Sequence, residues 1–147
     1  MYVLYSILAM IAVIGLMPMF LYRLMVEPGF GLRLRESFGY WSDEEVAKVA
    51  GKGCIWIHGA SVGEIVATSP LVKAIRAEWP DKPILVSAVT TGGYAMAKSI
   101  IPEADAILYF PLDLPWVVSR IVPRVRPCAF LPVETELWPN FLRAVAK

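Results

Sequence analysis

The sequence has few of the residues that build metal centres, disulfide frameworks or nucleic-acid-binding surfaces. Its 147 residues include two cysteines and one histidine, with no CxxC pair or cysteine/histidine cluster, so neither a zinc site nor a disulfide framework is expected. Charged residues make up only 18% and the net charge is +1, which argues against a nucleic-acid partner. The glycine fingerprints GxGxxG and GxxxxGK[ST], which bind nucleotide phosphates, are also absent.

Charge is also missing from the first 22 residues, "MYVLYSILAMIAVIGLMPMFLY". A helix of that length would measure about 33 Å, enough to cross a bilayer core of about 30 Å. The segment has no basic n-region and no small-residue cleavage site, so a membrane anchor is favoured over a cleaved signal peptide or a buried core helix. Membrane helices tolerate the kink that Gly15 and Pro18 favour. Tyrosines, which are common at membrane interfaces, lie near its ends at Tyr2, Tyr5 and Tyr22.

Basic residues follow this segment and none precedes it; the first are Arg23, Arg33 and Arg35. The positive-inside rule therefore predicts a single-pass anchor over residues 1–25, with the rest of the chain in the cytoplasm. Residues 26–52 mix basic and aromatic side chains, which suits either a surface facing anionic lipid headgroups or a solvated linker. A short helix with Ser42 as its N-cap and Glu45 three residues later is expected near the end of this segment.

From residue 53 to residue 147 the pattern alternates between short apolar runs and helical stripes. The apolar runs predict four strands, at residues 54–58, 84–90, 106–110 and 128–134. The stripes between and after them predict helices, at residues 63–79, 94–101, 115–122 and 138–147. Strands that are apolar on both faces and separated by helices indicate an α/β fold, a Rossmann-like parallel sheet with flanking helices.

Ligands of such sheets bind at the carboxyl ends of the strands, and four acidic residues fall in the turns there. They are Glu64, Asp113, Glu134 and Glu136. The turn "HGASVGE" leaves two interpretations of Glu64 open. In the first, Ser61 and Glu64 form a capping box, in which Ser61 accepts from the Glu64 N–H and Glu64 accepts from the Ser61 N–H. In the second, Glu64 is a general base that accepts a proton from a bound hydroxyl.

Three motifs occur together in the order "HGASVGE", "YFPLDLP" and "ETELWPN", behind the apolar segment. In this arrangement the chain resembles the 3-deoxy-D-manno-octulosonic acid (Kdo) transferases of Gram-negative bacteria, and "LRLRESFGYW" is similar to the family's basic segment after the anchor. The resemblance covers essentially the whole chain. "SVGE" alone is a weak signal, whereas its combination with "ETELWPN" at the fourth strand is specific.

The resemblance implies an inverting glycosyltransferase of the GT-B fold, which moves Kdo from CMP-Kdo onto the lipid A precursor, lipid IV-A. This reaction belongs to lipopolysaccharide core biosynthesis and takes place at the cytoplasmic face of the bacterial inner membrane. No metal or other cofactor is implied. In the family the amino-terminal domain receives the lipid acceptor and the carboxyl-terminal domain holds the CMP-sugar.

The resemblance also implies roles for individual residues. Glu64 is the expected general base, in a turn shaped by Ser61 and Gly63. Glu134 and Glu136 are expected at the substrate site, with Glu134 favoured as the one that lines it, and capping of the following helix is the alternative for both. Arg126, with Arg120 and Arg124, is expected near this carboxyl edge of the sheet, where it would meet lipid A phosphates. A solvated helix end explains each arginine too. His58 is expected to be structural.

The sequence ends at Lys147, within the helix after "ETELWPN". Against the resemblance, this predicts a partial acceptor domain over residues 53–147 with no donor-binding domain, and hence a chain that is inactive alone. An alternative function is a membrane-tethered protein that binds the acceptor without catalysis. The number of Kdo residues transferred and the oligomeric state are not predicted.

Overall fold

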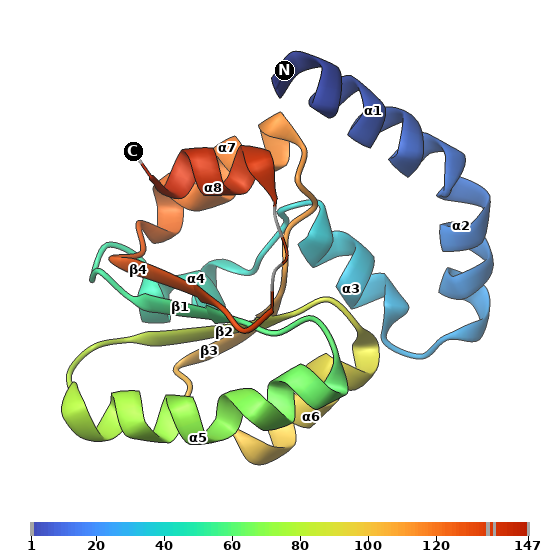
Figure 1. Ribbon diagram of the computed structural model, residues 1–147. Helices are drawn as coiled ribbons and strands as arrows, with labels where there is room; N and C mark the ends of the chain where they lie inside the picture. The colour runs from blue at the N-terminus through green and yellow to red at the C-terminus, as the bar shows by residue number, and fades with distance from the viewer. Residues whose placement is uncertain (1, 135, 137, 147) are drawn as a thin grey trace.

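Four parallel strands form the centre of the protein in the computed structural model, which describes residues 2–134, 136 and 138–146 (Figure 1). Their spatial order is β3-β2-β1-β4, and every neighbouring pair is parallel. The strands are β1 (Ile55–His58), β2 (Ile84–Ala88), β3 (Ala106–Tyr109) and β4 (Ala129–Pro132). All four predicted strands are therefore confirmed, each a little shorter than its apolar run.

Helices cover both faces of this sheet (Figure 1). One face carries α5 (Val62–Glu78) and α6 (Thr91–Ile100). The other carries α4 (Asp43–Val49), α7 (Pro115–Val125) and α8 (Pro139–Val145). Two apolar clusters, one on each face, form the core; Trp56 belongs to the first and Ile57 to the second. Because successive strand residues point to opposite faces, a strand buried between two helical layers is apolar throughout, which confirms the Rossmann-like α/β prediction.

The chain adds strands on one side of β1 first and then on the other. From β1 it proceeds through α5 and α6 to β2 and β3 at one edge, and α7 then carries it back across the opposite face to β4. After β1 the chain thus enters the α5 face, whereas after β4 it enters the α8 face (Figure 1). In open parallel sheets this switch point, at the carboxyl ends of the strands, is where ligands bind.

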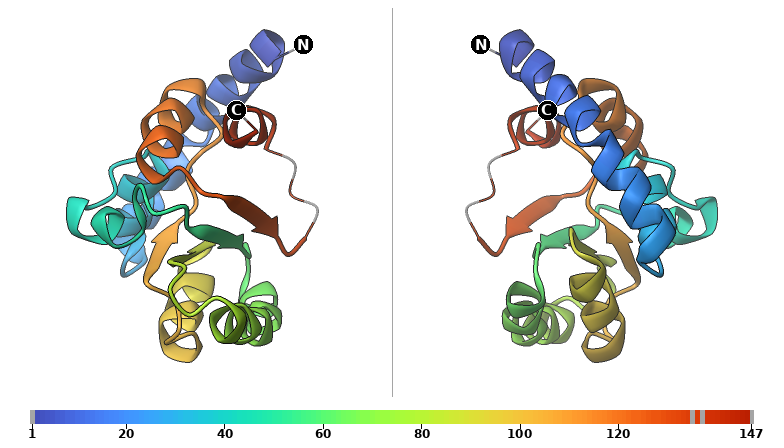
Figure 2. Two further views of the ribbon diagram at one scale, coloured as in Figure 1. Left: turned by 90° about the vertical axis from the view of Figure 1, so that its left-hand side faces the viewer. Right: turned by 90° about the vertical axis from the view of Figure 1, so that its right-hand side faces the viewer.

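The amino-terminal apolar segment forms two helices, α1 (Tyr2–Gly15) and α2 (Met17–Val26), and the break between them falls where Gly15 and Pro18 favour a kink. Pro18 lies in the first turn of α2, where its missing N–H costs nothing. No single helix among the described residues is long and apolar enough to cross a bilayer; the α1–α2 pair is by length and composition, with a 46° bend at the break. The pair runs along the outside of the domain (Figures 1 and 2), and α1 reaches α8 through a 3.3 Å hydrogen bond from Ser6 Oγ to Asn140 Oδ1.

The segment after these helices is more ordered than a linker. It contains α3 (Phe30–Ser37), in which Phe30 and Glu36 are buried. The Tyr109 N–H at the end of β3 donates to Glu36 Oε2 at 2.8 Å, and burial raises the pKa of this carboxyl. The expected helix α4 is confirmed, with its cap, because Glu45 N–H donates to Ser42 Oγ at 3.2 Å. This segment thus packs against the end of β3.

Candidate functional site

Glu64 lies in the first turn of α5, directly after β1 and beside the switch point. Half of the predicted capping box is present, since the Glu64 N–H donates to Ser61 Oγ at 3.5 Å. In place of the second predicted bond, from the Ser61 N–H to Glu64, there are two others. The Glu64 carboxylate accepts from the Ser61 hydroxyl at 2.6 Å and from the Ala60 N–H at 2.7 Å, each on a different oxygen. Both oxygens are therefore held by the turn.

These contacts keep the Glu64 carboxylate ionised. Burial raises its pKa, but the hydrogen bonds from Ser61 and from the Ala60 N–H outweigh burial and lower the pKa below the ordinary 4.5. The side chain is only partly buried. A carboxylate oxygen has two lone pairs, so each oxygen retains one acceptor position after these bonds. Glu64 can thus accept a hydrogen bond from a ligand hydroxyl without leaving its turn.

The close packing of this turn requires a glycine at Gly59, and not at Gly63, for which the resemblance predicts the shaping role. A Cβ at Gly59 would lie 3.3 Å from both Glu64 Cβ and Thr68 Oγ1, tighter than ordinary contact. A Cβ at Gly63 would meet no atom within 4 Å, and Gly63 is exposed. Ser61 does shape the turn, as its N-cap residue.

A chain of buried hydrogen bonds ends at the same edge of the sheet. Trp56 Nε1–H donates to Ser87 Oγ at 2.8 Å, and Ser87 Oγ lies 2.9 Å from His58 Nδ1. His58 Nε2 lies 2.9 Å from Glu136 Oε2. The Glu136 carboxylate can only accept, which favours a proton on Nε2. Nδ1 then accepts from the Ser87 hydroxyl, whose proton is free because Ser87 Oγ already accepts from Trp56, although Nδ1 also lies 3.2 Å from the Ser87 carbonyl. Burial lowers the pKa of His58 despite the neighbouring carboxylate, which favours this neutral form.

Glu136 and Glu134 have different environments, although both follow β4. Glu136 Oε2 accepts from His58 and from Trp138 Nε1 at 3.2 Å, which ties the loop after β4 to β1. Glu134 is exposed at the end of β4. The sequence favoured Glu134 as the residue that lines the site; the structure brings Glu136 to the switch point through His58.

The cap of α8 comes from Asp113, in the turn after β3, and not from either glutamate. Its buried carboxylate accepts from the Asn140 N–H at 3.0 Å and from the Phe141 N–H at 2.7 Å. The Asp113 carbonyl also accepts from Asn140 Nδ2 at 2.8 Å. The capping alternative for Glu134 and Glu136 is therefore wrong, because α8 has no side-chain cap of its own and Asp113 fills that role.

Arg126 lies at the opposite edge of the sheet from Glu64, so its predicted place near the carboxyl edge is wrong. It ends α7 with a positive φ of 49°, and its Nε donates to the Pro123 carbonyl at 3.2 Å. Two residues later, Cys128 N–H donates to the Cys54 carbonyl at 2.9 Å, just before β1 begins. A helix between parallel strands runs antiparallel to them, so its carboxyl end reaches the amino ends of the strands.

Sequence reasoning missed Ser87 and the capping role of Asp113. The signal for Ser87 was a single hydroxyl in the otherwise apolar run "ILVSAV", since a buried polar group must find a partner. Asp113 was placed at the correct edge, but its contact with α8 depends on tertiary structure. Across residues 2–134, 136 and 138–146, no three histidine, cysteine or acidic side chains come together as metal ligands.

Comparison with known proteins assigns this architecture to a family. The family model described as 3-deoxy-D-manno-octulosonic-acid transferase (kdotransferase) matches residues 32–147. The 3-deoxy-D-manno-octulosonic acid transferase of Haemophilus influenzae is 34% identical over 115 residues, which cover 78% of this chain and 26% of that protein. The transferase of the same description from Chlamydia muridarum is 33% identical over 105 residues, or 70% of this chain and 24% of that protein.

A further relative, described as a bifunctional glycosyltransferase/methyltransferase of Fusobacterium nucleatum, is 35% identical over 115 residues, 77% of this chain and 17% of that protein. The chain thus spans less than a third of the length of the curated relatives that it matches, from 17% to 31%. The matched region includes the whole sheet, the β1–α5 turn with Glu64 and the loop after β4 with Glu136. The chain belongs to the 3-deoxy-D-manno-octulosonic acid transferase family.

Proposed function

We propose that this chain forms the acceptor side of an inverting glycosyltransferase that moves Kdo from CMP-Kdo onto lipid IV-A. The observation that carries the proposal is the position of Glu64, an ionised carboxylate at the carboxyl end of β1, beside the switch point of a Kdo-transferase family sheet. Its two oxygens are fixed by Ser61 and Ala60, yet each can accept one more hydrogen bond. A fixed carboxylate with free acceptor positions suits a general base.

In the proposed step, a hydroxyl of the acceptor sugar donates its proton to Glu64. The hydroxyl oxygen forms a bond to the anomeric carbon of Kdo as the bond from that carbon to the CMP phosphate oxygen breaks. CMP leaves with the electron pair of the broken bond. Attack on the face opposite the leaving group inverts the anomeric configuration. The step requires no metal or other cofactor.

Glu136 is proposed to define the β4 side of the acceptor site. His58 and Trp138 both donate to Glu136 Oε2. The other carboxylate oxygen is then the one available to an acceptor hydroxyl, because Oε2 already takes two donors. Glu134 remains a second candidate for this contact, since it is exposed at the end of β4.

A membrane-tethered protein that binds the acceptor without catalysis is the second candidate. The hydrogen bonds that lower the pKa of Glu64 favour it, because a weaker base is a less effective proton acceptor. Under this interpretation Glu64 only caps α5, and the edge of the sheet serves for binding alone.

Transfer by a chimera tests the proposal. The matching segment of this chain replaces its counterpart in the Haemophilus influenzae relative, and transfer of Kdo from CMP-Kdo to lipid IV-A is measured with purified enzyme. We expect Kdo transfer at a rate within about tenfold of the parent, since Glu64 and its turn would supply the base. A chimera that folds, judged by circular dichroism, and binds lipid IV-A without transferring Kdo would favour the second candidate instead.

We also propose that α1 and α2 anchor the chain to the bacterial inner membrane, with the sheet on the cytoplasmic side. Both helices expose large apolar side chains, among them Leu4 and Ile11 on α1 and Leu21 and Met25 on α2. Exposed apolar area of this extent favours transfer into lipid, at about 25 cal/mol per Å². Arg23 follows the apolar stretch, as the positive-inside rule requires.

Extraction of membranes with alkaline carbonate tests the anchor. The chain is expected to stay in the membrane pellet, and Ile11→Arg is expected to release much of it, since arginine at the centre of a span costs about 2.5–3.5 kcal/mol. The matched control is Val66→Arg, at an exposed apolar position on α5, which is expected to leave the chain in the pellet. Complete extraction of the unmodified chain would contradict an integral anchor.

A further inference from the structure

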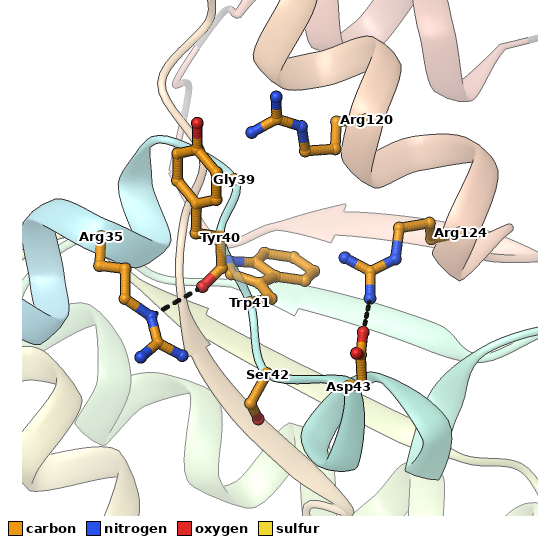
Figure 3. Close-up of a pocket in the computed structure, with 8 residues that line it drawn as sticks. All are labelled: Arg35, Gly39, Tyr40, Trp41, Ser42, Asp43, Arg120 and Arg124. Atoms are coloured by element: carbon orange, nitrogen blue, oxygen red, sulfur yellow. Dashed lines mark hydrogen bonds and ion pairs between the residues drawn. The ribbon is translucent and has the colours of Figure 1, made fainter.

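An arginine-rich pocket lies on the outside of the domain, between α3, α4 and α7 (Figure 3). Its volume is about 560 Å³, and it is lined by residues 39–43 and by Arg35, Arg120 and Arg124. Asp43 is the one carboxylate among these lining residues, which include three arginines; Figure 3 shows Arg120 and Arg124 on one side of residues 40–42 and Arg35 on the other. The pocket belongs to neither the β1–α5 turn nor the loop after β4, and its use does not depend on the proposed transferase function.

Two of these arginines come from the same face of α7. Arg120 and Arg124 are four residues apart, and like charges at this spacing on a helix repel each other. Figure 3 shows both side chains extending from α7 toward residues 40–43. The Arg120 guanidinium lies 4.5 Å from the centre of the Tyr40 ring, and within the described part of the chain it forms no ion pair. An anion between the two guanidiniums would relieve their repulsion.

The other contacts in the pocket fix its walls and leave it accessible. Arg35 Nε donates to the Tyr40 carbonyl at 3.1 Å, which holds this residue beside Arg120. Arg124 pairs with Asp43 at 2.6 Å, but the Asp43 side chain is 98% exposed. Ion pairs this exposed are weak, so a ligand with a stronger charge can displace Asp43.

We propose that this pocket binds a phosphate monoester. Guanidinium groups bind phosphate oxygens through paired N–H donors, so Arg120 and Arg124 together can neutralise a dianion. Tyr40 adds its hydroxyl, which lies near Arg120 in Figure 3, and the face of its ring holds the Arg120 guanidinium through a cation–π contact. A dianion is favoured over a single carboxylate because it can hold both arginines at once and compete with Asp43.

Nuclear magnetic resonance of the full chain in zwitterionic detergent, with inorganic phosphate as the probe, tests this site. The Nε–H signals of Arg120 and Arg124 are expected to shift saturably. Arg120→Gln and Arg124→Gln should each weaken binding about tenfold, the loss expected for one charge-assisted contact. Asp43→Asn should strengthen it, because the competing carboxylate is gone. Lys73→Gln, at an exposed position on α5, is the matched control and should leave the affinity unchanged.

The source of the phosphate is resolved by two further probes, glucose 6-phosphate and phosphatidylcholine vesicles that contain phosphatidate. Binding of the soluble ester that depends on Arg120 and Arg124 indicates a soluble metabolite. The same dependence for vesicles alone indicates a lipid headgroup. The proposal is overturned if phosphate causes no saturable shift at millimolar concentration, or if Lys73→Gln weakens binding as much as Arg120→Gln while circular dichroism shows all variants folded.

Discussion

Replacing Glu64 by glutamine in the chimera is expected to reduce Kdo transfer by about 10²–10⁴-fold, the usual contribution of a general base. Glutamine has nearly the same shape, and its carbonyl oxygen can still accept from Ser61 or from the Ala60 N–H. It cannot take a proton from the acceptor hydroxyl. The fold should therefore survive while kcat falls. Glu78→Gln, at the exposed far end of α5, is the matched control and should leave transfer unchanged.

The pH dependence of transfer separates a base from a cap. A base must be ionised, and the pKa of Glu64 lies below the ordinary 4.5, so the acid limb of kcat/KM should lie below the range of an ordinary glutamate. Ser61→Ala removes one of the hydrogen bonds that lower this pKa and should move the limb to higher pH. It should also destabilise the fold by about 0.5–2 kcal/mol, as loss of an N-cap does. Near-normal transfer by Glu64→Gln, together with a loss of stability, would mean that Glu64 is only a cap.

The sheet was predictable because its signals are local. A strand buried between two helical layers must be apolar on both faces, and "CIWIH" and "AILYF" carry that pattern without help from distant residues. The caps at Ser42 and Ser61 likewise depend on a partner three residues away. The position of Glu64 at the carboxyl edge then follows from topology alone.

What was missed depends on contacts between distant parts of the chain. The helix α3 forms where glycine and arginine make the pattern weak; the packing of Phe30 against Phe20 and the hydrogen bond from the Tyr109 N–H to the buried Glu36 carboxylate hold it in place. The contact between His58 and Glu136 joins residues 78 apart in sequence. The resemblance placed Arg126 near the site, whereas the direction of α7, which only the topology reveals, puts it at the opposite edge of the sheet. Periodicity gives the identity of an element, but not the partners of its side chains.

Removal of the Trp56 side chain should have the largest effect on stability. Trp56 is fully buried, and its ring packs against Phe141 at 4.9 Å, Trp41 at 5.5 Å and Phe130 at 5.9 Å between ring centres. It thus joins β1 to α8, to the segment before α4 and to β4. Trp56→Ala would leave a large cavity and cost about 3–5 kcal/mol, a large share of the roughly 5–15 kcal/mol that stabilises a typical domain.

Two companion variants assign the loss at Trp56. Trp56→Phe keeps most of the ring contacts but removes the Nε1–H that donates to Ser87 Oγ at 2.8 Å, so it should cost about 1–3 kcal/mol. Trp79→Ala, at a half-exposed tryptophan on the surface, should change stability by only about 0.5 kcal/mol. The measurement is urea unfolding of the full chain in mild detergent. Similar losses for Trp56→Ala and Trp79→Ala would contradict this packing, whereas the expected order would mean that Trp56 stabilises the core both through its ring contacts and through its hydrogen bond to Ser87 Oγ, the atom that also lies 2.9 Å from His58 Nδ1.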